Sequence, residues 1–261
     1  MKVLKEFSRY FVGGLFIFSG LIKVNDPVGT AIKLEEYFEV FAYDFAPFFE
    51  YFIPASLFLS VFLSVLEVAL GLALLLGFKI KETAWALLVM IVFFTFLTFY
   101  SAYFNKVTDC GCFGDAIKLT PWETFWKNVI LIGLILLLLI RVKDIKEIFS
   151  KKITFALTLL SLISFSSITF HVLNHLPIID FRAYAVGKNI PEGMEFPEDP
   201  NELPPVHDFM LEDTQNDLAP QILAMDKVML VIVYNADKSD EEGFVAIKKV
   251  ADKAISKGYN V

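Results

Sequence analysis

Apolar residues are concentrated in five long runs along the first two thirds of the chain, and charged residues gather in the segments between them. The runs cover residues 10–22, 54–76, 83–103, 121–140 and 153–176. A helix crosses a hydrocarbon core of about 30 Å with about 20 residues, or with fewer where the bilayer thins. The pattern therefore predicts an all-α integral membrane bundle with five spanning helices.

Local patterns within this half predict how the helices begin and pack. Residues 28–52 mix acidic and aromatic side chains, which is typical of an amphipathic helix at the membrane surface. In the first run, Gly13, Gly14 and Gly20 favour close contact with a neighbouring helix. Residues 120–123 (Thr-Pro-Trp-Glu) have the N-cap, first-turn proline and capping-box glutamate of a helix start.

After the fifth run the pattern changes to a mixed α/β type. Residues 177–204 are rich in proline, glycine and charge, as linkers are. Residues 208–213 then alternate like a strand, and residues 228–234 form an apolar run typical of a buried strand. Residues 240–257 have the apolar stripe of an amphipathic helix, which ends at Gly258. This strand–helix unit opens without its partner strands, so we expect the sequence to be truncated.

Composition and charge agree with a membrane protein and predict its orientation. Hydrophobic residues make up 56% of the chain, and the net charge of -7 comes with no basic patch, which argues against nucleic-acid binding. Ten lysines and arginines lie in the N-terminal tail, the 79–81 turn and the 141–152 loop, against four in the opposite segments. The positive-inside rule predicts a cytoplasmic N-terminus, and a cysteine-containing loop and a tail outside the inner membrane, in a bacterial periplasm. No small-residue cleavage site follows the first run, so we expect it to be retained.

The only two cysteines, Cys110 and Cys112, lie between the third and fourth runs, separated by Gly111. Paired thiols on the oxidising side of a membrane favour thiol–disulfide exchange. A bridge across one residue closes a very small ring, and strained disulfides are the more reducible ones. An inert structural bridge and a metal site are the alternatives. Asp109 and Asp115 disfavour a thiolate, whereas the lysines at 106 and 118 favour it.

Glu67 lies near the middle of the second run, where a carboxyl group is costly and is therefore a functional candidate. Proton handling or contact with a headgroup or quinone is one reading, and a structural hydrogen bond, with Ser64 as local partner, is the other. No basic residue is expected at the same depth. Lys23, at the outer end of the first run, is expected to extend its ammonium to the interface.

Two histidines, His171 and His175, lie four residues apart near the outer end of the fifth run. A Cys2His2 metal site with the cysteines is conceivable, but histidines at an interface more often serve as polar anchors, and we assign no metal. Trp122 and Trp126 are typical of the aromatic belt at a membrane surface.

Several short stretches are similar to a known membrane family: residues 14–20 with Lys23, residues 67–71 with Gly77, and residues 110–114 (Cys-Gly-Cys-Phe-Gly). Over about residues 8–142 the chain resembles the DoxX-like superfamily and, within it, the methylamine-utilisation protein E family. The resemblance implies a four-helix core. It also implies a role in maturing a disulfide-rich periplasmic enzyme subunit alongside a thioredoxin-like partner. The fifth run and the tail are additions to this pattern.

The tail resembles the opening of a thioredoxin-like, redoxin-type domain, through residues 205–213 and 227–234. In active members of that family a Cys-x-x-Cys pair follows the central strand, whereas residues 235–243 contain no cysteine. The resemblance therefore implies a partial α/β module that lacks the family's redox chemistry and could bind or position another protein.

These observations predict four parts: a DoxX/MauE-like membrane domain (1–142), a cytoplasmic loop with a fifth span (143–176), a linker (177–204) and a partial thioredoxin-like domain (205–261). The favoured function is an inner-membrane thiol–disulfide protein. Its cysteine pair would pass electrons between a periplasmic client or thioredoxin-like protein and either a membrane quinone or a second redox protein. The alternative is a non-catalytic anchor or assembly factor that docks the redox-inactive module.

Overall fold

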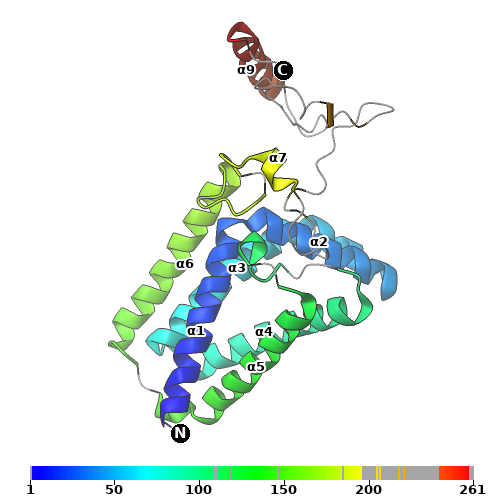
Figure 1. Ribbon diagram of the computed structural model, residues 1–261. Helices are drawn as coiled ribbons and strands as arrows, with labels where there is room; N and C mark the ends of the chain where they lie inside the picture. The colour runs from blue at the N-terminus through cyan, green and yellow to red at the C-terminus, as the bar shows by residue number, and fades with distance from the viewer. Residues whose placement is uncertain are drawn as a thin grey trace. The chain divides into compact units, whose positions relative to one another are not determined.

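The computed structural model describes residues 2–107, 111–117, 119–145, 147–183, 185–195 and 241–258, with 204, 206, 217, 220 and 221. The chain divides into two compact units, residues 1–185 and 186–261, and each is described by itself. The first unit is a helical bundle (Figure 1), in which five of the described helices are long and apolar enough to cross a membrane.

The five predicted runs are all helical: α1 (Lys2–Asn25), α3 (Ser56–Leu76), α4 (Ile80–Phe104), α5 (Pro121–Ile140) and α6 (Lys151–Asn174). The first helix is longer than its apolar run. It extends through polar side chains near both of its ends, and these side chains are buried against other parts of the bundle. Near its start, Arg9 is 4% exposed. Its guanidinium donates hydrogen bonds to the carbonyls of Leu74 (3.0 Å) and Leu75 (2.7 Å), which lie in the last turn of α3.

The capping box before α5 is confirmed. The Glu123 amide donates to the Thr120 hydroxyl at 3.3 Å, and the Thr120 amide donates to the Glu123 carboxylate at 2.8 Å. Pro121 is the first helical residue, where its missing N–H costs no hydrogen bond. These local contacts fix where α5 begins and therefore how long the preceding cysteine loop is.

The segment between α1 and α3 forms α2 (Pro27–Asp44) and the short 3-10 helix η1 (Pro47–Ala55). Figure 1 shows α2 running across one end of the bundle. Its buried face includes Ala31, Leu34, Tyr37 and Phe41. The prediction of an amphipathic helix is confirmed, and its place at the membrane surface stays a prediction.

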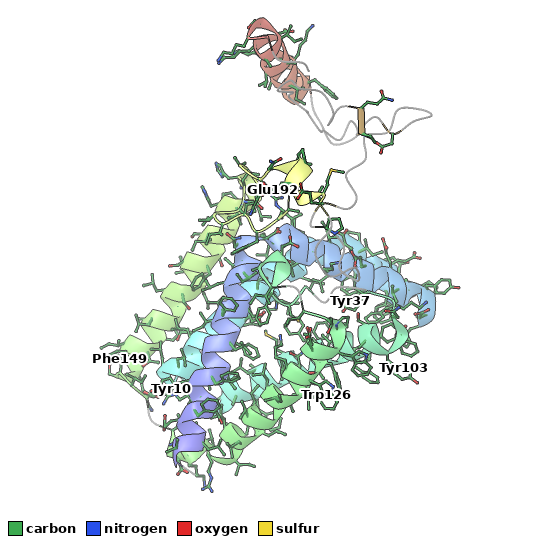
Figure 2. All side chains as sticks on the ribbon, viewed as in Figure 1. Tyr10, Tyr37, Tyr103, Trp126, Phe149 and Glu192 are labelled. Atoms are coloured by element: carbon green, nitrogen blue, oxygen red, sulfur yellow. The ribbon has the colours of Figure 1, made fainter. Side chains whose placement is uncertain are left out.

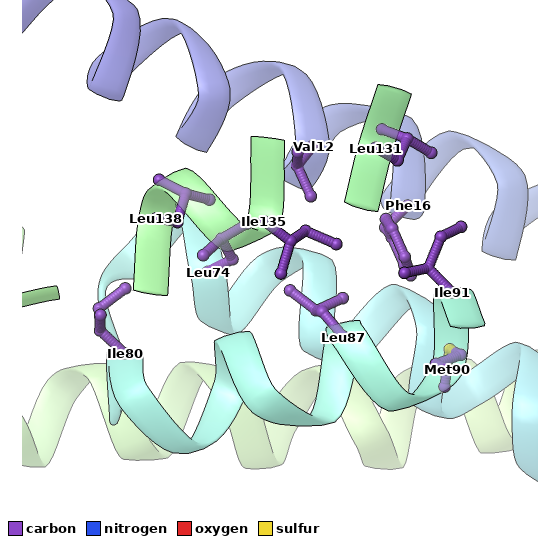
Figure 3. Packing of buried hydrophobic residues seen from close by; sticks show 10 residues of the cluster. All are labelled: Val12, Phe16, Leu74, Ile80, Leu87, Met90, Ile91, Leu131, Ile135 and Leu138. Carbon is purple, nitrogen blue, oxygen red and sulfur yellow. The ribbon is translucent and has the colours of Figure 1, made fainter. Parts of the chain in front are cut away.

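The core of the bundle is formed by apolar residues from four helices (Figure 3), namely Val12, Phe16, Leu74, Ile80, Leu87, Met90, Ile91, Leu131, Ile135 and Leu138. Many large apolar side chains on the outer faces of the same helices are exposed. Because the chain spans the membrane, these outer faces contact the lipid bilayer.

Glycine allows α1 and α3 to pack closely. A Cβ atom at Gly20 would lie 2.5 Å from Cγ2 and 2.9 Å from the backbone nitrogen of Val68. A Cβ atom at Gly71 would lie 2.8 Å from the carbonyl oxygen of Gly13. At Gly14 nothing lies within 4 Å, so the predicted helix contact is confirmed for Gly13 and Gly20 and is wrong for Gly14.

Gly20→Ala should therefore destabilise the bundle by about 1–3 kcal/mol, the usual cost of adding a methyl group to a packed contact. Gly14→Ala is the matched control, because it adds the same group on the same helix into open space. Thermal unfolding of both purified variants in detergent measures the difference. Equal unfolding temperatures would contradict the close α1–α3 contact.

Contacts at one end of the bundle show which segments lie together there. The Lys5 ammonium donates to the Asp144 carbonyl (2.7 Å) and the Ile148 amide donates to the Leu76 carbonyl (3.0 Å). The N-terminal tail, the turn after α3 and the loop after α5 therefore share that end. These are the three segments that carry the excess of positive charge, so the grouping that the positive-inside rule needs is present.

The rule places this end in the cytoplasm, which labelling can test. In a background that carries Cys110→Ser and Cys112→Ser, Lys106→Cys should react with a membrane-impermeant maleimide in intact cells. Lys143→Cys should react only after lysis, although both lysines are exposed. The reverse pattern would place the cysteine loop in the cytoplasm and remove the periplasmic argument.

The second unit contains the short helix α7 (Ile190–Gly193) and the helix α9 (Glu241–Ser256). The predicted amphipathic helix is confirmed by α9, and Gly258, at φ 85°, has the left-handed conformation of a C-terminal cap. The two predicted strands, 208–213 and 228–234, lie outside the described residues.

Candidate functional site

The second cysteine of the pair is built into the bundle. Cys112 is 9% exposed, and its carbonyl accepts a hydrogen bond from the Ser19 hydroxyl of α1 at 2.9 Å. Gly111 has φ 63°, and a Cβ atom there would lie 3.0 Å from Cγ of Lys33, so both backbone and space favour glycine. Cys110, like Asp109 and Lys118, lies outside the described residues.

A buried ion pair lies beside Cys112. The Lys23 ammonium of α1 is 2.7 Å from the Glu67 carboxylate of α3, and the two residues are 5% and 4% exposed. The same ammonium lies 4.6 Å from the centre of the Phe94 ring on α4, a cation–π contact. Three helices thus meet at one charged group.

This geometry corrects three predictions. Lys23 does not extend to the interface, because its ammonium is held inside the bundle by Glu67. Glu67 does have a basic partner at its depth, because the Lys23 ammonium lies 2.7 Å from its carboxylate. Ser64 is not its hydrogen-bond donor, because the Ser64 hydroxyl donates to the Ser60 carbonyl at 2.7 Å.

Cys112 and the ion pair line the same internal cavity of about 20 Å³, together with Ser19, Lys127 and Asn128. Such a space holds about one water molecule. The Asn128 side chain is 1% exposed, and its amide nitrogen has no hydrogen-bond partner among the described residues. A buried amide without a partner costs about 1–3 kcal/mol, so a water shared with its polar neighbours is the expected remedy.

Among the described residues, the lysines that line the cavity of Cys112 come from α1 and α5, outside its own loop. Lys127 lines its cavity and also lies 4.3 Å from the centre of the Phe113 ring. Lys106 is instead paired with Asp44 at 3.4 Å. The Tyr100 hydroxyl and then Lys106 hold the pKa of the Asp44 carboxyl below its usual range.

Asp115 lines a different cavity, of about 200 Å³, which Gly111 also lines. Asp26 at the end of α1 and the segment after α6 form other walls of it. There the Arg182 guanidinium is 2.7 Å from Asp180 and holds the pKa of that carboxyl below its usual range. The cysteine loop therefore contributes residues to two cavities, one through Cys112 and the other through Gly111 and Asp115.

The two histidines pair with each other at the end of α6. Their rings stack with centres 4.3 Å apart, and His175 Nδ1 lies 2.9 Å from the His171 carbonyl oxygen. In the described part of the chain, no group of three or more His, Cys, Asp or Glu residues is placed to hold a metal. Trp122 and Trp126 are 45% and 59% exposed on α5, and their place in an aromatic belt stays a prediction. Figure 2 labels Trp126 on the outer face of this helix.

Sequence reasoning missed Ser19, Asn128 and Lys127 as parts of the site. A signal for Asn128 was present: Thr124 and Asn128 lie one turn apart on the strongly apolar α5, and both are buried. Polar side chains at this spacing on a spanning helix face protein rather than lipid. Ser19 and Lys127 gave no comparable signal, because their roles depend on where the cysteine loop folds back.

Comparison with known proteins covers the region that holds the site. The family model described as "Methylamine utilisation protein MauE" matches residues 1–141, which include Lys23, Glu67 and both cysteines. The chain is also similar to "Protein TlpB" of Flavobacterium psychrophilum, with 26% identity over 161 residues, 60% of this chain. It covers 42% of the length of that protein, less than half. No solved structure matches.

Proposed function

This chain is a multi-pass membrane protein of the MauE family, and we propose that it carries out thiol–disulfide exchange through Cys110 and Cys112. The observation that supports this best is the cavity that Cys112 shares with the Lys23–Glu67 pair and with Lys127. An inert loop bridge needs no buried charges next to it, and burying an ion pair is costly. Perturbing charges next to a cysteine are instead typical of reactive thiols.

The exchange conserves two electrons and two protons. In the oxidising direction, a client thiolate attacks one sulfur of the Cys110–Cys112 disulfide, forms a mixed disulfide and releases the other sulfur as a thiolate. A second client thiolate then attacks the mixed disulfide. The client gains a disulfide, and the cysteine pair gains the two electrons and two protons. The reducing direction runs through the same bonds in reverse.

Lys23 and Lys127 have a role in each of these steps. Both line the cavity of Cys112, and an ammonium stabilises the negative charge that a sulfur carries when its disulfide bond breaks. The Glu67 carboxylate holds Lys23 in place at 2.7 Å. Glu67 therefore acts as a positioning residue.

The client would approach from the 200 Å³ cavity that Gly111 lines. The walls of this cavity carry acidic and basic side chains in equal number: Asp26, Asp115, Asp180, Lys23, Lys33 and Arg182. The excess of lysine and arginine at the opposite end of the bundle favours a periplasmic position for this cavity, at the inner membrane. A periplasmic disulfide-containing protein or a thioredoxin-like protein fits this location.

A docking role is the second candidate. The tail residues 235–243 contain no cysteine, so a thioredoxin-like module there would bind without exchanging disulfides. In that case the bundle is an anchor, and the cysteine pair only fixes the loop. The two functions differ in whether the cysteines ever form a bond to another protein.

Trapping of a mixed disulfide tests this difference. Cys110→Ala and Cys112→Ala each remove the sulfur that would resolve the intermediate, so at least one of them should accumulate a reductant-sensitive adduct with a client. Cells expressing the two variants are acid-quenched, alkylated and compared on non-reducing gels. The double variant is the control and should form none. No adduct from either single variant would favour the docking role.

A further inference from the structure

An apolar groove lies between α2, η1 and α4, close to the candidate site. It has a volume of about 480 Å³, within the range of about 300–1,000 Å³ that is typical of small-molecule sites. Seven of its nine lining residues are aromatic, and Tyr37, Phe41, Phe93 and Phe96 are among them. Phe93 and Phe96 are 40% and 48% exposed, so the groove is open on the outer face of α4.

The groove adjoins the site of Cys112. Leu34, Tyr37 and Leu97 line both the groove and a narrower space of about 40 Å³, and Lys23 and Cys112 line that narrower space. Tyr37 (Figure 2) packs in one cluster with Leu97 at this junction. A molecule in the groove would therefore have one end in lipid-facing aromatic surroundings and the other end toward the thiol.

The charges at the inner end indicate a neutral ligand. Lys23 is paired with Glu67 at 2.7 Å, and Lys33 is paired with Glu36 at 3.0 Å. Each cation already has a carboxylate, so the end of the groove has no excess positive charge to attract a lipid phosphate. Flat rings stack favourably on aromatic side chains, and an acyl chain gains nothing from them beyond its apolar contact.

We propose that this groove binds a membrane quinone, with its ring stacked on the aromatic walls at the Tyr37 end, nearest Cys112, and its isoprenoid tail toward the open, lipid-facing end. The inference rests on the proposed function, because it identifies the electron acceptor of the cysteine pair. The two S–H bonds of Cys110 and Cys112 break and one S–S bond forms. The two electrons and two protons go to the quinone carbonyls, which gives a quinol.

Binding and reduction of a short-chain ubiquinone analogue test the proposal on the full chain in lipid nanodiscs. Phe93→Ala/Phe96→Ala removes two rings from the groove at exposed positions, so no buried cavity is left. It should weaken equilibrium binding of the radiolabelled analogue by about tenfold or more, which corresponds to about 1.4 kcal/mol. Phe58→Ala/Phe62→Ala is the matched control, because those rings are 69% and 50% exposed on α3 and do not line the groove.

The cysteine variants separate this proposal from the proposed function. Cys110→Ala/Cys112→Ala, saturated with the analogue, should not bleach its quinone absorbance, because no thiol is left to supply the two electrons. Failure of the wild type to bind it, or equal binding by the groove and control variants, would overturn the quinone site. The quinone site would also be overturned if the reduced wild type binds the analogue without oxidising its cysteines, while the same cysteine pair still exchanges with glutathione disulfide. Absence of that exchange would instead contradict the proposed function.

Discussion

Glu67→Gln should destabilise the bundle by about 3 kcal/mol or more and slow disulfide exchange strongly, because the Lys23 ammonium would remain buried after losing its carboxylate. Glutamine keeps the shape of the side chain, so packing against α1 changes little. The expected loss therefore reports the charge alone. Thermal unfolding in detergent and the rate of exchange with glutathione disulfide measure the two effects separately.

The double variant Lys23→Met/Glu67→Gln separates stability from function. Replacing both members of a buried ion pair by uncharged groups of similar size is often neutral or stabilising. Stability should therefore recover, while exchange stays slow because the cavity of Cys112 has lost the ammonium. Recovery of exchange as well would show that the pair serves only the fold.

Lys33→Met is the matched control for the loss of an ammonium. Lys33 pairs with Glu36 at 3.0 Å, but the two side chains are 27% and 39% exposed. Such partly exposed pairs contribute about 0–1 kcal/mol, so the unfolding temperature should change little. A destabilisation as large as that of Glu67→Gln would contradict the importance of burial.

The spanning helices could be predicted from the sequence because their signal is local. A run of apolar residues must form helix in lipid, where every backbone group needs a partner within the segment. The same is true of the start of α5, where Thr120 and Glu123 cap the helix through residues three apart. The helix α9 also follows from its own apolar stripe.

The Lys23–Glu67 pair could not be predicted by counting depth along each run. The polar ends of α1 lengthen the helix, and α1 crosses α3 with Gly20 against Val68, which brings Lys23 within reach of mid-α3. A useful signal was nevertheless present in α3, where four small or polar residues share one helical face: Ser60, Ser64, Glu67 and Gly71. Such a stripe on an apolar helix faces a protein neighbour.

The burial of Cys112 depends on contacts between distant parts of the chain. Ser19 holds its carbonyl, and the side chain of Lys33 packs over Gly111. Charge counting within the loop gave Asp109, Asp115, Lys106 and Lys118 as its neighbours, whereas the structure brings Lys23 and Lys127 to its cavity. The motif predicts thiol–disulfide exchange, and only the fold shows which lysines lie near the thiol.

Cys110→Ala and Cys112→Ala should each reduce exchange with glutathione disulfide to the background of the double variant. A disulfide relay needs both sulfurs, and neither alanine can replace one. The bundle should stay folded, because its helices are held by apolar and glycine contacts away from the loop. Unfolding temperatures near that of the wild type would show this. Full exchange by either variant would contradict the assignment.

The central claim is tested most directly by a redox titration of the purified full chain. The protein is equilibrated in glutathione or dithiothreitol buffers, acid-quenched and alkylated with a mass-tagged maleimide, so that a gel separates the reduced and oxidised forms. The account predicts one two-electron transition at a potential above about -300 mV, the range below which stable structural disulfides lie. A potential well below that value, or no transition at all, would show that the cysteine pair is structural.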